Sequence, residues 1–334
     1  MLSLVIISYL HRKDKLFRSM VWWTGINFFT GVNQMTTIEL INKYFSQTMA
    51  EALLSIGFNV LANAEEIRIR LNQPLFLRDN TSEKTSSPPY RPNEADISST
   101  LERLCGHSFY AFADNIRAGF LTLPGGHRVG ICGAVAVEDG RISAIKHVTG
   151  LNIRIAREVL GCADIAMPHL LDPGGNVRNT LIVSPPACGK TTLLRDIIRQ
   201  ISNSWANVAL VDERGEVSGA HLGAAQMDLG SRTDVLAGAP KADGMMMVLR
   251  SMSPDVIAVD ELGSVDDGLA VELCSTAGVA IICTVHGGSF DDLRLKAHLS
   301  KLLDAGIFQR YIFLSRHPAA GSISKILDSN QGGI

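Results

Sequence analysis

The chain has 334 residues, of which 46% are apolar, enough for one large or two modest globular domains with buried cores. This composition excludes disorder of the whole chain. The formal net charge of −2 gives no overall attraction to nucleic acid or to an anionic membrane, so any such contact must be local. The six cysteines are scattered without a C-x-x-C pair, which argues against a zinc module or a disulfide framework and indicates reduced core residues of a cytosolic protein.

The first 35 residues form an unusual segment. An apolar run at residues 2–10 is followed by a basic patch and then by an aromatic stretch at residues 21–29. A transmembrane helix needs about 20 mostly apolar residues, and a signal peptide has its positive charges ahead of the apolar run. We expect an extension, residues 1–35, ahead of a domain that begins near Met35. The alternative is a segment that binds the membrane interface through Trp22, Trp23, Phe28 and Phe29.

Residues 36–160 mix helices and hairpins. Apolar residues at helical spacing predict a helix over residues 36–56, with Thr36 or Thr37 as its N-cap. Alternation of Ile67, Ile69 and Leu71 with arginines predicts a hairpin that turns at residues 72–74.

Further elements follow in the same half of the chain. We expect a loop at residues 80–93, a helix at 95–105, strands at 116–123 and 128–137, and one more short strand after the turn at 138–140. Because helices and strands do not alternate regularly, the segment is predicted to be a smaller N-terminal α+β domain.

Residues 161–334 have a different pattern, because apolar strands now alternate with amphipathic helices. This alternation predicts a parallel α/β sheet in one domain. The expected strands are residues 180–184, 208–211, 256–259, 279–284 and 311–314. The expected helices have apolar faces at Leu194, Ile197, Ile198 and Ile201, at Leu269, Leu273 and Ala277, and along a third helix that runs from Ser289 to Leu303.

The strongest chemical signal is the segment SPPACGKTT between the first strand and the first helix of this half. It resembles the Walker A pattern G-x-x-x-x-G-K-[ST], whose backbone amides bind phosphates at a helix N-terminus. Lys190 is expected to reach the β- and γ-phosphates and Thr191 to bind magnesium. Ser184 stands at the first glycine of the pattern. The predicted nucleotide-binding residues are Ser184, Pro185, Pro186, Ala187, Cys188, Gly189, Lys190, Thr191 and Thr192.

Two further strands end in polar residues. The strand VIAVDE matches a Walker B pattern, in which Asp260 would hold magnesium and Glu261 would polarise the attacking water. We expect this strand beside the phosphate loop. The next strand ends at Thr284 and is followed by His286, which would sense the γ-phosphate or orient the water. The alternatives are a solvated helix cap for the two acids and a hydrogen-bonded structural role for the histidine.

Several segments together resemble the stage III sporulation AA family of P-loop ATPases, which is similar to the type II and type IV secretion ATPases. They are IRAGFLTLPGGHRVGICG, SPPACGKTTLLRDIIR, VDERGEV, SRTDVL and KADGMMMVLRSMSPDVIAVDELG, at residues 116–133, 184–199, 211–217, 231–236 and 241–263. The resemblance extends from about Met35 to near the end of the chain. It implies a RecA-like core behind a smaller domain, bound ATP and Mg²⁺, a homo-hexamer, and action in the mother-cell cytoplasm on membrane-embedded sporulation channel or export proteins.

The resemblance also implies site residues that spacing leaves open. Secretion ATPases have an acidic box after the second core strand, here Asp212, Glu213 and Glu216, so Glu213 competes with Glu261 as the residue that activates water. Arg250 and Arg232 are candidate arginine fingers, and Arg117, Arg128 and Arg154 are further residues that could reach a neighbouring subunit's nucleotide. For any single arginine the alternative is a surface salt bridge.

Three functions stay open from the sequence. The first is a motor ATPase that energises assembly or export through a membrane apparatus. The second is a nucleic-acid-dependent ATPase, although no basic stripe interleaved with aromatic residues is present. The third is a nucleotide-gated scaffold with little turnover, which the serine at position 184 would allow.

Overall fold

The computed structural model describes residues 35–79, 82–117, 119–317, 321–329 and 333. The expectations for residues 1–34 lie outside this range. Within it, no helix is both long enough and apolar enough to cross a bilayer.

The first half of the described chain is built on a six-stranded antiparallel sheet, in the order β3-β2-β1-β6-β5-β4. Its strands are β1 Ala64–Arg70, β2 Phe76–Asp79, β3 Glu83–Lys84, β4 Phe120–Thr122, β5 Arg128–Glu138 and β6 Arg141–Arg154. Its helical segments are α2 Thr37–Tyr44, α3 Gln47–Leu54, α4 Phe58–Ala62, α5 Glu94–Leu104, η1 Tyr110–Phe112 and α6 Ala113–Arg117. Apolar side chains from the sheet and from α2, α3 and α5 form one buried cluster.

The second half is built on a seven-stranded sheet, in the order β13-β12-β7-β11-β10-β8-β9, with β13 alone antiparallel to its neighbour. Its strands are β7 Thr180–Ser184, β8 Val208–Asp212, β9 Thr233–Ala237, β10 Val256–Val259, β11 Ala280–His286, β12 Arg310–Ser315 and β13 Ser322–Asp328. Its helices are α7 Met167–Leu170, α8 Lys190–Ser204, α9 Lys241–Ser251, α10 Val265–Thr276, α11 Phe290–Arg294 and α12 Ala297–Asp304.

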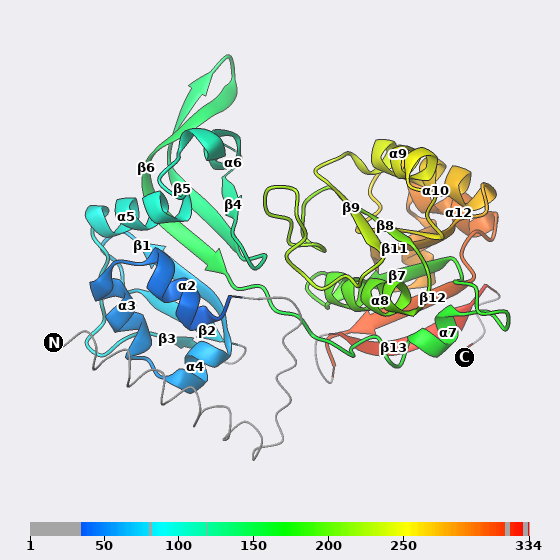
Figure 1. The fold of residues 1–334 in the computed structure, drawn as a ribbon, viewed down its shortest axis with the longest axis horizontal. Coiled ribbons are helices and arrows are strands. Elements are labelled where there is room, and N and C mark those ends of the chain that lie inside the picture. The colour runs from blue at the N-terminus through cyan, green and yellow to red at the C-terminus, as the bar shows by residue number, and fades with distance from the viewer. Residues whose placement is uncertain (1–34, 80–81, 118, 318–320, 330–332, 334) are drawn as a thin grey trace. The chain divides into compact units, whose positions relative to one another are not determined.

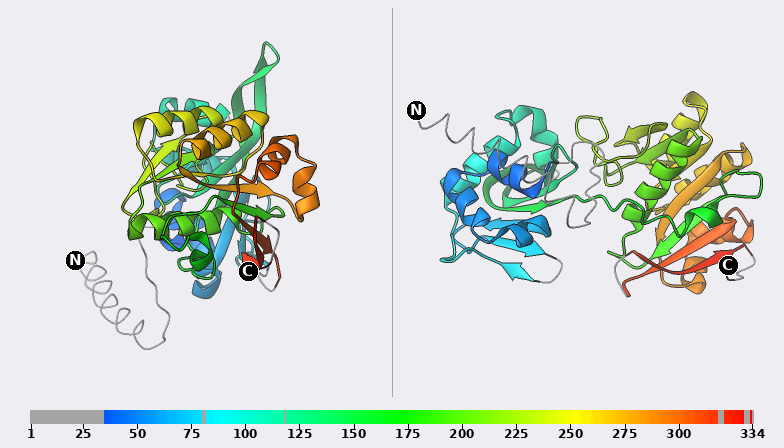
Figure 2. Two further views of the ribbon diagram at one scale, coloured as in Figure 1. Left: turned by 90° about the vertical axis from the view of Figure 1, so that its right-hand side faces the viewer. Right: turned by 60° about the horizontal axis from the view of Figure 1, so that its bottom comes forward.

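Helices cover both faces of this second sheet (Figure 1), and Figure 2 shows the same layers from two further directions. Side chains that alternate along β7 pack on opposite faces of the sheet. Ile182 packs with α8, whereas Leu181 and Val183 pack with the helices of the other face. Burial on both faces explains why β7, β8 and β10 consist of continuous apolar runs.

Most elements predicted in the first half are present, with four corrections. The helix predicted over residues 36–56 is two helices, because the chain leaves the helical conformation at Phe45 and Ser46 caps α3. Thr36 is the N-cap of α2, in a capping box with Glu39. The strand predicted at 116–123 is only β4, preceded by α6, and the loop at 80–93 contains β3. The strand after the turn at 138–140, predicted to be short, is β6, which has 14 residues.

In the second half all five predicted strands are present, but β9 and β13 were not predicted. The helix expected from Ser289 to Leu303 is broken into α11 and α12. The predicted apolar face of α10 is wrong, since Leu269 and Leu273 are 48% and 55% exposed, whereas Ala270, Val271 and Cys274 face the core. A proposed domain boundary near residue 160 falls in the connection between the two sheets.

Gly230 lies where the loop before β9 packs closely against α8. Gly230 has φ +81°, and a Cβ there would lie 2.7 Å from the carbonyl oxygen of Arg199. Gly278 has a similar φ of +87° but open space around it. We predict that Gly278→Ala costs about 1 kcal/mol from backbone strain alone. Gly230→Ala should cost about 1–3 kcal/mol more, because the added methyl group overpacks against the helix.

Thermal and urea unfolding of the two variants and the wild type measure this difference. Equal destabilisation by the two substitutions would contradict the close packing.

Candidate functional site

Parallel strands bring their carboxyl ends to one edge of the second sheet, and the candidate site is built there. The expectation that the acidic strand lies beside the phosphate loop is wrong in detail. β10, which leads into Asp260, is separated from β7 by β11, and the residue pairs Val259–Cys283 and Ser184–His286 fix this order. His286 therefore lies between the phosphate loop and the two acids instead of beyond them.

The phosphate loop joins β7 to α8. Two of its residues have left-handed backbone conformations, Ala187 with φ +57° and Gly189 with φ +79°, and Gly189 is the N-cap of α8 without any side-chain cap. The first amides of α8 therefore have no partner within the helix, and such a helix N-terminus attracts anions.

Ser184 does not strain the loop. It is the last residue of β7, it is fully buried, and its φ is not in the left-handed region that would call for glycine. Its hydroxyl donates to the carbonyl oxygen of Pro185 at 2.8 Å. A serine is thus accommodated at the position where the motif usually has glycine.

Lys190 begins α8 and is only 8% exposed. Its Nζ is 3.3 Å from Nδ1 and 3.4 Å from Nε2 of His286. Because the two ring nitrogens are almost equally distant, the ammonium group does not lie along the lone-pair direction of either nitrogen. This partner is not a carboxylate, so the contact itself does not neutralise the charge of Lys190.

Asp260 follows β10 and has two hydroxyl partners. Thr191 of α8 donates to Oδ2 at 2.9 Å, and Thr284 of β11 donates to Oδ1. Burial raises the pKa of Asp260, although both hydroxyl groups and the charge of Lys190 oppose the shift. A hydroxyl group and a carboxylate are oxygen ligands of the kind that Mg²⁺ prefers beside phosphates, so Thr191 and Asp260 fit this cation.

Glu261 is the next residue and has an unusual backbone, with φ +56°. Its carboxylate lies 3.5 Å from Nε2 of His286 and 3.8 Å from a guanidinium nitrogen of Arg214, and its side chain is 39% exposed. The carboxylate is therefore accessible to water and adjacent to the residue that contacts Lys190.

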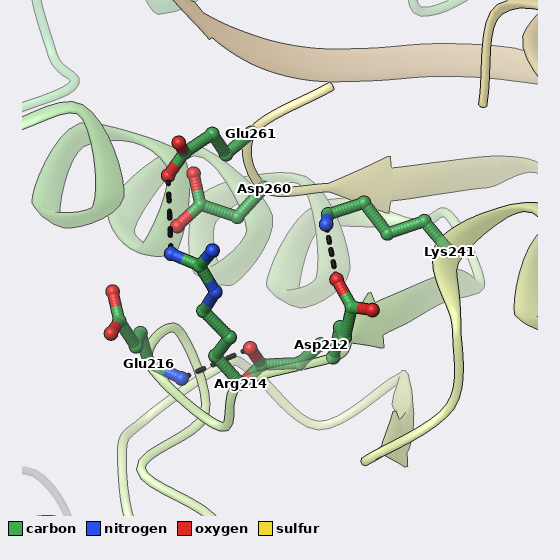
Figure 3. A pocket seen from close by; sticks show the side chains of 7 residues that line it. Asp212, Arg214, Glu216, Lys241, Asp260 and Glu261 are labelled. Atoms are coloured by element: carbon green, nitrogen blue, oxygen red, sulfur yellow. Dashed lines mark hydrogen bonds and ion pairs between the residues drawn. The ribbon is translucent and has the colours of Figure 1, made fainter. Parts of the chain in front are cut away.

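The acidic loop after β8 supplies the other side of the site. Asp212 is buried and accepts hydrogen bonds from the amides of Glu216 and Ser218 and from the Ser218 hydroxyl, so it holds the loop in shape. Glu213 instead pairs with Lys241 of α9. Figure 3 shows the small pocket that these groups surround. It is lined by Asp212, Glu213, Arg214, Glu216, Lys241, Asp260 and Glu261.

Arg195 of α8 links this loop to the phosphate-loop helix, and it is not among the site residues predicted from the sequence. Its guanidinium donates to the carbonyl oxygens of Val217 at 2.7 Å and Glu216 at 2.9 Å. Burial lowers its pKa, and nearby carboxylates including Asp212 and Asp260 oppose that shift. Its position four residues after Thr191, on the same helix face, was the signal that could have identified it.

The candidate arginine fingers do not line the pocket. Arg232 precedes β9, at the amino edge of the sheet, and contacts the carbonyl oxygen of Trp205 at 3.4 Å. Arg250 is exposed near the end of α9, about 13 Å along the helix from Lys241 by helical rise. Arg128, one of the further arginines, pairs with Glu216 of its own chain.

Comparisons with known proteins agree with this fold. The protein is 15% identical to the pilus retraction motor PilT, whose structure contains ADP, with a TM-score of 0.54 over 80% of this chain and 76% of that one. It is 16% identical to the Legionella pneumophila ATPase DotB, with a TM-score of 0.52 over 75% and 72%. These similarities confirm an α/β core of the RecA-like P-loop type.

Similarity in sequence identifies the family. The chain is 38% identical to stage III sporulation protein AA of Bacillus subtilis (strain 168) over 295 residues, 87% of this chain and 95% of that protein. It is 31% identical to protein SEEDLING PLASTID DEVELOPMENT 1 of Arabidopsis thaliana over half of this chain and a quarter of that protein. The family model for sporulation stage III, protein AA matches residues 36–333. The chain therefore belongs to the sporulation stage III protein AA family.

Proposed function

We propose that the chain binds ATP with Mg²⁺ at the phosphate loop and hydrolyses it to ADP and phosphate. The observation that carries the proposal is the hydrogen bond between Thr191 and Asp260, which joins a phosphate-loop helix to an acidic strand end in the way a Mg²⁺–nucleotide site requires. The resident cation would neutralise phosphate charge, held by these two side chains.

Lys190 and His286 have linked roles in this proposal. A γ-phosphate is a far stronger partner for the ammonium group than an imidazole, so Lys190 would bind the phosphate oxygens and leave His286. The histidine, already 3.5 Å from Glu261, would then be free to contact the nucleotide or the attacking water.

Glu261 and Glu213 remain the two candidates for polarising the water. Glu261 is adjacent to Asp260 and His286, whereas Glu213 is paired with Lys241. Glu261 also faces a cation, Arg214, but at 3.8 Å, whereas Glu213 and Lys241 are in direct contact. The looser pair leaves the Glu261 carboxylate freer to accept a proton, so we favour Glu261.

The unstrained Ser184 favours hydrolysis over the scaffold alternative. Its buried hydroxyl is satisfied within the loop, and its backbone conformation needs no glycine. The motif's departure from its usual form therefore requires no strained backbone at this position. The nucleic-acid alternative has no comparable observation in its favour.

We further propose a homo-hexameric motor in the mother-cell cytoplasm that energises a membrane-embedded sporulation channel or export complex. Membership of the sporulation stage III protein AA family supports a role in sporulation, and the similarity in fold to PilT and DotB supports a motor. Arg250 or Arg232 would complete the site of a neighbouring subunit, since neither lines the pocket of its own chain.

Two substitutions separate nucleotide binding from hydrolysis. Lys190→Ala should weaken ATP binding about 10- to 100-fold, because a charged hydrogen bond to phosphate is worth about 1.5–3 kcal/mol. Glu261→Gln should bind ATP within about 3-fold of wild type but turn it over about 10²–10⁴ times more slowly, since it removes the proton acceptor. Fluorescent-nucleotide titration and phosphate release measure the two effects.

Glu213→Gln is the matched comparison for this assignment. If Glu213→Gln rather than Glu261→Gln retains binding and loses turnover, then Glu213 is the acceptor. Equal loss of binding in Lys190→Ala and Glu261→Gln would contradict both roles.

Assembly should control activity. If an arginine completes a neighbour's site, the specific ATPase rate should rise with protein concentration and follow the appearance of oligomer in solution mass measurements. Arg250→Ala should assemble as wild type does and lose about 10³-fold or more in rate. A fully active monomer would contradict the proposal of a shared site.

A further inference from the structure

Thr284, near the end of β11, contacts both of the acids that follow β10. It is fully buried. Its hydroxyl donates to Oδ1 of Asp260 and accepts the amide hydrogen of Glu261 at 2.9 Å, while its carbonyl oxygen accepts the amide of Leu262 at the same distance. One residue thus binds three consecutive residues of the turn.

These contacts act on a strained backbone. A left-handed conformation costs a residue with a side chain about 1–2 kcal/mol, and Glu261 adopts one with φ +56°. The hydrogen bond from its amide to the Thr284 hydroxyl and that from the next amide to the Thr284 carbonyl oxygen are the contacts that hold this turn against β11. They fix the direction in which the Glu261 side chain leaves the turn.

The direction of each hydrogen bond is determined. An amide can only donate and an ionised carboxylate can only accept, so the single hydroxyl hydrogen of Thr284 must point to Asp260. The chain of bonds therefore runs from the Glu261 amide through the Thr284 hydroxyl to Asp260, and a movement of that carboxylate is transmitted to the backbone of Glu261.

We propose that Thr284 is a positioning residue that couples the placement of Asp260 to the orientation of the Glu261 carboxylate, and so sets the rate of hydrolysis rather than the affinity for ATP. The inference rests on the proposed ATPase function and adds to it a residue that acts through Asp260 and Glu261.

The affinity for ATP should remain unchanged, because the groups expected to bind the phosphates do not contact Thr284. Lys190 and the first amides of α8 are independent of it, and Asp260 keeps its hydrogen bond from Thr191. A threonine that only filled space would behave as Thr180 does, a second fully buried threonine, at the start of β7, whose hydroxyl bonds to the backbone carbonyl of Arg178.

The test compares hydroxyl removal at the two threonines. Thr284→Val keeps the shape of the side chain and removes its hydrogen bonds, so kcat should fall about 10- to 100-fold while the KM for ATP stays within about 3-fold. Thr284→Ser restores the hydroxyl and should recover a kcat within about 3-fold of wild type. Thr180→Val should leave both constants within about 2-fold of wild type.

A double-mutant cycle with Glu261 provides the readout that a general structural role would not move. If Thr284 acts through Glu261, Thr284→Val added to Glu261→Gln should slow single-turnover hydrolysis by less than about 3-fold. If the double variant is instead slowed by the product of the two single-variant effects, the coupling is overturned. A normal kcat in Thr284→Val, or a loss of ATP affinity like that of Lys190→Ala, would also overturn it.

The design separates failure of this inference from failure of the proposed function. Absence of turnover in the wild-type assembly overturns both, whereas an active wild type with an equally active Thr284→Val overturns the inference alone. Circular dichroism and the melting temperature establish folding. If Thr284→Val does not fold, Thr284→Cys, a much weaker donor and acceptor, carries the same expectation of a reduced kcat and an unchanged KM.

Discussion

The site depends on one partly buried carboxylate, Asp260, and on the two hydroxyl groups that bind it. Withdrawing a carboxylate from water is costly unless hydrogen bonds or a cation compensate the charge, and desolvation indeed raises the pKa of Asp260. Thr191 and Thr284 reach it from α8 and from β11. The same carboxylate thus joins the phosphate loop, the acidic strand and the strand between them, and a bound cation would complete its compensation.

The acidic loop after β8 is held by a second set of contacts around this centre. Asp212 shapes the loop by accepting three hydrogen bonds from it, and Arg195 holds two of its carbonyl oxygens from α8. Glu213, which follows β8, and Glu261, which follows β10, both line one small pocket. Figure 3 shows Glu261 beside Arg214 there. Asp212 therefore both shapes the loop and lines the pocket, whereas the Glu213 carboxylate lines the pocket and pairs with Lys241.

Local patterns predicted the second sheet well because its strands are buried on both faces and read as apolar runs, as β7 and β10 do. They did not predict β9, whose residues are only partly buried, or β13, an antiparallel edge strand. Strand order is a long-range property, so the position of β11 between β7 and β10 could not follow from spacing. The exposed leucines of α10 show that helical periodicity identifies a stripe without determining whether it is buried.

The most direct test of this account is phosphate release by the wild-type assembly and by Asp260→Asn, measured across a range of Mg²⁺ concentrations. Asparagine has nearly the same shape but no charge, so it would retain the packing of the turn and lose the attraction for the cation. We predict a rate at least about 100-fold lower and a higher Mg²⁺ requirement for the asparagine variant, in a protein that melts within a few degrees of wild type. Equal rates and equal Mg²⁺ dependence in the two proteins would contradict the central place of Asp260.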